Sequence, residues 1–323
     1  MIQKKHLKNF VTRGRSLSLE KSKSTDDELG YLKQLPGTWK NLPNLPGRGW
    51  NMIALPFVNP KGANLNYRLL VNQYDEELHF TTIGKGIPNR GITREKGSFV
   101  NSDQFIVTLD YTQSINQVAA DDFPKSGLAG KKGLAIHHEP GLFLQMANEF
   151  ESRLEVARLA SVPHGNSVLA LGEVRIYDGA PSIPDENGLP VGIPKDLNNP
   201  YLAPYKHYND HLFKGVFNPI HPNKLLKSAN EGVHINRTTE LKFDTKFASG
   251  GIHNIPFIEK QANATEMTAT FWIQELEEKN ENGDPKLRIQ YTQTVMLDFF
   301  EVPSGSGLIK WPHVSINTME KVD

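Results

Sequence analysis

The chain has 323 residues with 36 basic and 36 acidic side chains, and its isoelectric point is about 7.2. This balance leaves no net charge of the kind that attracts nucleic acid, so we predict no nucleic-acid partner. The sequence contains no cysteine, which excludes disulfides, thiolate metal sites, cysteine-ligated iron–sulfur clusters and a cysteine nucleophile.

The first 29 residues carry several basic side chains, but no continuous apolar stretch follows them. A secretory signal requires such a stretch, and nowhere does the sequence contain a charge-free apolar run long enough to cross a bilayer. We therefore expect residues 1–29 to form a basic, flexible arm. We also expect a cytoplasmic protein with no transmembrane segment.

From residue 30 to residue 323 most of the sequence alternates between apolar and polar residues, as antiparallel strands do. The short gaps between these runs leave little room for crossover helices, so we predict a single all-β domain. The expected strands are 49–56, 67–83, 104–113, 133–136, 142–147, 154–160, 167–177, 239–248, 264–275, 286–300 and 309–318.

The region 178–237 differs from the rest because it is rich in proline and asparagine and has weak periodicity. Loops of this length are usually lids, subunit contacts or small packed subdomains. We interpret it as an insertion or lid with a short helix near 209–216, and a homo-oligomer formed through it is an open alternative.

The last expected strand carries the most informative residue, His313. Along a strand, Trp311, His313, Ser315 and Asn317 share one face. If that face points inward, the imidazole lies in the protein interior beside an indole and can serve as a metal ligand. A surface histidine, or one that is hydrogen-bonded in the core, is the alternative.

Three further histidines are candidates for a binding pocket. His137 and His138 are adjacent, so on a strand they point to opposite faces, and we take His138 as the candidate. His164 lies between proline and glycine, which predicts a turn. His253 follows two glycines that permit close approach to a ligand, although a bend in the sheet explains them equally well.

Four segments, taken in order, resemble the nitrobindin and fatty-acid-binding-protein-like haem-binding barrels. The first is similar to the family's opening Leu-x-Gly-x-Trp, and the second to its acidic strand followed by a glycine turn. The third resembles the paired His-x-Glu-x-Gly and small-x-Pro-x-Gly signatures, and the fourth the closing pair of strands. In this sequence they are residues 35–39, 74–84, 138–141 with 160–165, and 291–296 with 312–316.

The resemblance implies a closed antiparallel up-and-down barrel of about ten strands, of the calycin type, that holds haem b at one mouth. It implies that His313 is the axial ligand of the iron. The cofactor contacts expected with it are Trp311, Thr38, Trp39, His138, His164 and His253.

The reaction implied by the resemblance concerns NO, peroxide or a related small oxidant. Peroxidase or nitrogen-oxide isomerase activity remains open, and no catalytic residue is assigned. The chain departs from the family at residues 40–50, which replace a glycine-rich stretch, and through the insertion. The alternative is a non-haem carrier of a fatty acid or another apolar small molecule, whose carboxylate needs a cation such as Arg48, Arg90, Arg94 or Arg158.

Overall fold

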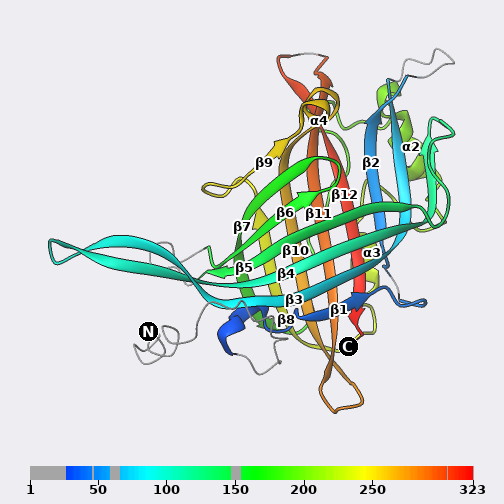
Figure 1. Cartoon of the computed structure of the whole chain (residues 1–323). Coiled ribbons are helices and arrows are strands. Elements are labelled where there is room, and N and C mark those ends of the chain that lie inside the picture. Colours follow the sequence, from blue (N-terminus) through cyan, green and yellow to red (C-terminus); the bar gives the residue numbers. More distant parts are fainter. Residues whose placement is uncertain (1–26, 46, 59–65, 147–153, 304, 323) are drawn as a thin grey trace.

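The computed structural model describes residues 27–45, 47–58, 66–146, 154–303 and 305–322. Nearly all of the expected basic arm therefore lies outside the described residues. Most of the rest is antiparallel β-sheet, which confirms the expected all-β class (Figure 1). In the described ranges, no helix combines the length and apolar character needed to cross a membrane.

In the part of the chain that the structure describes, ten antiparallel strands close into a ring (Figure 1). Nearly all neighbours in the ring are also neighbours in sequence, and β12 pairs back onto β2. The strands of the ring are β2 (Trp50–Pro56), β3 (Tyr67–Glu95), β4 (Ser98–Phe123), β5 (Ala135–Met146), β6 (Val156–Val162), β7 (Asn166–Asp178), β8 (Ile235–Asp244), β10 (Asn263–Lys279), β11 (Pro285–Glu301) and β12 (Leu308–Lys321).

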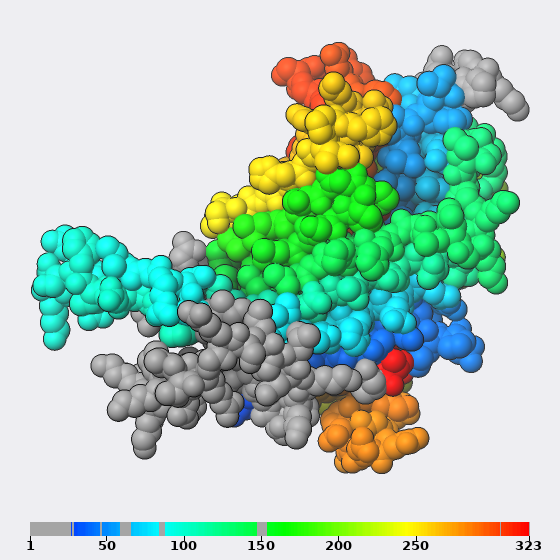
Figure 2. Space-filling model, in the orientation of Figure 1, coloured from blue at the N-terminus to red at the C-terminus, as the bar shows by residue number. Residues whose placement is uncertain are grey.

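Two four-residue strands complete the sheet, and the sequence did not predict either of them. β1 (Gly37–Lys40) pairs with both β3 and β12, so β1 and β2 together fill one place in the ring. β9 (Gly251–Asn254) pairs with β7. Beyond the ring, β3 and β4 continue as a long two-stranded hairpin that projects from the body (Figures 1 and 2).

One end of the ring is filled by an apolar core. Inward-facing side chains of several strands meet there, and the 3-10 helix η1 (Asp27–Leu32) adds the fully buried Leu29 and Leu32. Trp39 of β1 is also fully buried in this cluster. Among the strand residues of this cluster are Leu78, Phe80, Leu109, Phe143, Phe243, Phe271 and Met319.

The insertion packs against the outer wall of the ring. Trp50 of β2 faces outward and stacks on Phe217, with ring centroids 5.3 Å apart. Phe123 of β4 stacks on His207 at 4.3 Å, and Gln290 of β11 donates to the Leu226 carbonyl at 3.0 Å. The segment therefore packs against the outside of the ring, although a lid was one expectation. Its elements are η2 (Pro200–Leu202), α2 (Ala203–Asp210) and α3 (Lys224–Ser228). The helix expected near 209–216 begins and ends earlier, as α2.

Candidate functional site

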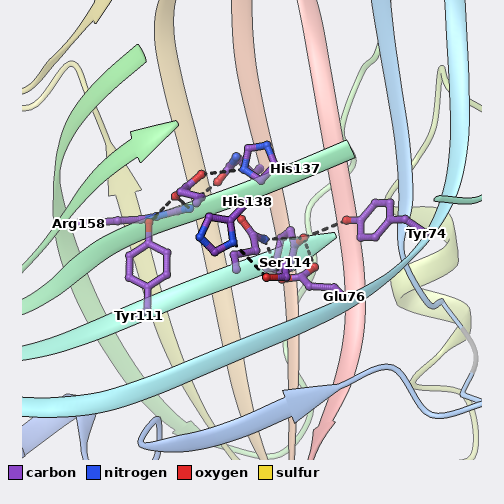
Figure 3. A network of polar contacts seen from close by, with 11 residues as sticks. Tyr74, Glu76, Tyr111, Ser114, His137, His138 and Arg158 are labelled. Carbon is purple, nitrogen blue, oxygen red and sulfur yellow. Dashed lines mark hydrogen bonds and ion pairs between the residues drawn. The ribbon is translucent and has the colours of Figure 1, made fainter. Parts of the chain in front are cut away.

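A buried ion pair lies inside the ring. Arg158 of β6 places Nη2 2.7 Å from Oε1 of Glu139 on β5, and its Nε donates to the Tyr111 hydroxyl at 3.0 Å (Figure 3). Tyr111 donates in turn to Glu139, and Arg158 Nη1 donates to Gln293 at 2.6 Å. The register places these side chains on the inner face of neighbouring strands.

The ion pair keeps Glu139 charged in spite of its burial. Burial alone raises the pKa of the Glu139 carboxyl. The Arg158 charge and the hydrogen bonds from His137 and Tyr111 outweigh burial and hold this pKa at about 2. The interior therefore contains a fixed carboxylate at physiological pH.

His137 lies two residues before Glu139 on β5, so the two side chains share the inner face. Its Nε2 is 3.1 Å from Glu139 Oε2. An ionised carboxylate only accepts hydrogen bonds, so Nε2 is the donor to Glu139, and in the neutral form of the ring the lone pair lies on Nδ1. Nδ1 makes no hydrogen bond to any described residue, and the His137 side chain retains 19% of its accessible surface.

A second buried carboxyl belongs to Glu76 of β3. It accepts hydrogen bonds from Tyr291 at 2.6 Å, Gln113 at 2.7 Å and Asn317 at 2.8 Å. Burial raises the pKa of Glu76, while these three donors and the charge of His137 oppose the rise. Glu76 faces the interior because side chains alternate along the strand, and its neighbours Asp75 and Glu77 are exposed.

His313 of β12 faces the interior of the ring, paired in register with Val295 of β11. Protein surrounds it, and burial, reinforced by His137 and His164, lowers its pKa to about 3. It nevertheless keeps some solvent-accessible surface, and neither ring nitrogen bonds to a described residue. Because buried polar atoms normally have partners, this imidazole is open to water or a ligand inside the ring.

His164 brings a third imidazole toward the same region. It lies in the turn between β6 and β7, and its ring centroid is 5.8 Å from that of His137. Burial, followed by the charge of His137, lowers the His164 pKa. In the residues that the structure describes, no group of three or more histidine, aspartate or glutamate side chains is arranged to hold a metal ion.

Two predicted contacts lie far from His313. Trp39 belongs to the closed apolar end, where its Nε1 donates to the Leu35 carbonyl at 2.8 Å. It pairs with Lys321, eight residues beyond His313, a separation of roughly 26 Å along a strand. Thr38 pairs with the outward-facing His79, with its Oγ1 2.9 Å from His79 Nδ1.

Two predicted histidines lie on the outer face. His138 is exposed, and its Nδ1 lies 3.2 Å from the Ser114 hydroxyl. His253 is exposed on β9, opposite the exposed Ser167. Glu139 pairs with the buried Gln113, which fixes the odd-numbered residues of β5 as the inner face, so His137 faces the interior and the predicted His138 does not.

Trp311 forms part of the wall of the ring. It is fully buried, stacks on Phe299 with ring centroids 4.9 Å apart, and lies 4.4 Å from the Tyr67 ring. Its indole nitrogen donates to the Phe299 carbonyl. Aromatic neighbours thus cover the faces of the indole, so Trp311 offers no open surface to a ligand beside His313.

Comparisons with known proteins assign no family to this chain. No family model matches it, and no curated protein does. A search of solved structures finds similarity to the crystal structure of Rv2717c from M. tuberculosis, with a TM-score of 0.39 and 14% identity. The alignment covers 94% of this chain and 100% of the other, and similarity at this level supports no inference about function.

Proposed function

We propose that the ring is a calycin-like barrel that binds haem b through His313 and handles a small oxidant such as NO or peroxide. The observation that carries this proposal is the state of the imidazole. It is enclosed, faces the interior and has no hydrogen bond to a described residue. With a pKa of about 3, it is neutral at physiological pH, so protons do not compete with iron for its lone pair.

The side chains near His313 on the inner face suit a porphyrin. Val295 lies beside it on β11, and the register of β2 and β3 places Ile53 and Leu70 on the inner face. All three are only partly buried although they face inward, so they offer apolar surface to a ligand. When bound, haem would supply redox-active iron, while these residues would exclude water from its faces.

A carrier of an apolar carboxylate has less support. Such a site needs a cation that is free to meet the carboxylate. Arg158 is committed to Glu139, Tyr111 and Gln293. The other three candidate arginines lie elsewhere: Arg48 pairs with Asp75, Arg90 pairs with Asp103, and Arg94 lies over the Phe99 ring on the projecting hairpin.

Titration of the purified protein with hemin tests the proposal. We expect a sharp Soret band in the wild type, and its loss or a strong shift in His313→Ala. His253→Ala is the matched control, because that exposed imidazole lies on the outer face. An unchanged spectrum in His313→Ala would show that the assignment is wrong, and co-purified lipid without haem in native mass spectrometry would favour the carrier.

A further inference from the structure

A histidine that is oriented by a carboxylate can act as a general base, and His137 has this arrangement inside the ring. We propose that His137 is the general base of the interior and that the oxidant is a protic peroxide instead of NO. This inference rests on the proposed function, because it concerns the ligand that would meet haem on His313. The residues that carry it are mainly His137, Glu139 and Arg158, on β5 and β6.

The hydrogen bond to Glu139 fixes the state of the ring. The Nε2–H group of His137 donates a hydrogen bond to Glu139 at 3.1 Å, so in the neutral ring the lone pair is on Nδ1. Glu139 cannot rotate freely, because Arg158 and Tyr111 hold its other oxygen. A base must present a lone pair in a fixed direction, and this network provides both the lone pair and the direction.

Two carboxyl groups and two imidazoles surround His137, so an imidazolium formed there would lie directly against the Glu139 carboxylate. Glu139 is in direct contact and ionised, and Glu76 is the second carboxyl whose electrostatic interaction reaches His137. The neighbouring imidazoles of His164 and His313 have lowered pKa values and so remain neutral. The positive charge of Arg158 is balanced by Glu139.

The step that follows is a simple proton transfer. The O–H bond of a bound hydrogen peroxide molecule breaks and an N–H bond forms at Nδ1 of the neutral His137 ring, which leaves a hydroperoxide anion and an imidazolium. No electron moves in this step, and the proton can return to either oxygen of the ligand. NO carries no proton, so His137 has no role as a base when NO binds.

Nuclear magnetic resonance of the ligand-free protein tests the state of the ring directly. Long-range ¹H–¹⁵N spectra distinguish the two imidazole tautomers, and the His137 signals are assigned by their loss in His137→Gln. We expect the Nε2–H tautomer with an unprotonated Nδ1. A proton on Nδ1 in the neutral ring would overturn the proposal.

Rapid-mixing kinetics of the hemin-loaded protein test the role in the reaction. We expect His137→Gln, which can still donate to Glu139, to slow the reaction with hydrogen peroxide by about 10²–10⁴-fold, the usual contribution of a general base. Association with NO should stay at the wild-type rate. His138→Gln is the matched control, because the adjacent imidazole points outward and should leave both rates unchanged.

The outcomes separate this inference from the proposed function. An equal loss of the peroxide and NO rates in His137→Gln would overturn the inference, because the effect would not depend on a proton. A wild-type peroxide rate in that variant would also overturn it. Failure of the wild type to bind hemin would instead overturn the proposed function, and the tautomer of the ligand-free protein would still decide whether His137 can act as a base.

Discussion

His313 shows how one enclosed imidazole makes stability depend on pH. In the folded protein its pKa is about 3, against an ordinary value of 6.5. The unfolded chain therefore binds a proton that the folded chain does not, at any pH between these two values. His313 therefore does not reduce the free energy of unfolding above pH 6.5, and it reduces it progressively as the pH falls from 6.5 toward 3.

The substitution His313→Leu should remove this acid sensitivity. Each pKa unit is worth about 1.4 kcal/mol, so we expect the wild type to lose up to roughly 2–3 kcal/mol through His313 between pH 6.5 and 4.5. The variant should lose less over the same interval. Urea denaturation of the ligand-free proteins measures this, with His253→Leu as an exposed control. Equal pH dependence in wild type and His313→Leu would contradict the buried, neutral state.

Glu139 responds to acid in a lower window. Its pKa is about 2 when folded, against an ordinary 4.5, so its ion pair contributes fully above pH 4.5 and is lost as the pH falls from there toward 2. Between pH 6.5 and 4.5 the pH dependence of stability therefore contains the contribution of His313 but not that of Glu139.

Among the elements, the insertion has the clearest energetic role. Phe217 is fully buried and stacks on Trp50, which belongs to the strand that closes the ring. The insertion thus covers apolar side chains that point away from the interior. Without it, the outer faces of β2 and β12 would expose these side chains to water.

We expect Phe217→Ala to destabilise the protein by about 3–5 kcal/mol, the usual cost of removing a buried aromatic ring. Leu212→Ala is the matched control in the same segment, because Leu212 retains 40% of its surface and should change stability little. Chemical denaturation of both variants measures the difference. Similar stability of the two variants would show that the insertion does not support the wall.

The sequence predicted most strands but not their limits. β5 was expected as two strands because Pro140 and Gly141 interrupt its pattern. Pro140 is paired in register with Thr112 of β4, but pairing with β6 begins only at Gly141, so on the β6 side no paired residue faces Pro140. A side chain at Gly141 would collide with the Tyr111 ring, which is why the strand contains a glycine there.

The candidate site was predicted in part. The alternation of side chains between the two faces of a strand predicted which residues of β12 share a face with His313. For His137 and His138 the same pattern allowed either choice, because only the pairing of β5 with β4 decides which residue faces inward. The Glu139–Arg158 pair could not be predicted, since its members come together only when β5 and β6 align.

At the scale of the whole molecule, the ring depends on contacts between its two ends. The Oδ1 atom of Asn317 accepts hydrogen bonds from the backbone N–H of Gly49 and from the Asn41 amide, both at 2.6 Å. Its Nδ2 donates to Glu76. One buried amide thus joins β12 to β3 and to the segment that connects β1 with β2.

Replacing this amide in Asn317→Ala leaves buried groups without partners, so we expect a loss of about 1–3 kcal/mol. Hydrogen exchange should quicken at residues 49–53 and 313–318 before it does elsewhere in the sheet. Asn116→Ala, at an exposed position on β4, should leave the exchange pattern unchanged. Uniform quickening across all strands in Asn317→Ala would argue against a local joint.

The pairing of β12 with β2 spans only Val314, Ser315 and Ile316, directly after His313. Gly49 and Asn317 meet across 268 positions of the sequence, so this seam is formed at a large cost in chain entropy. If the proposed ligand binds His313 in the folded protein only, saturating ligand would stabilise the folded protein, this seam included, through mass action. Conversely, a change that destabilises the pairing of β12 with β2 would lower the affinity for that ligand.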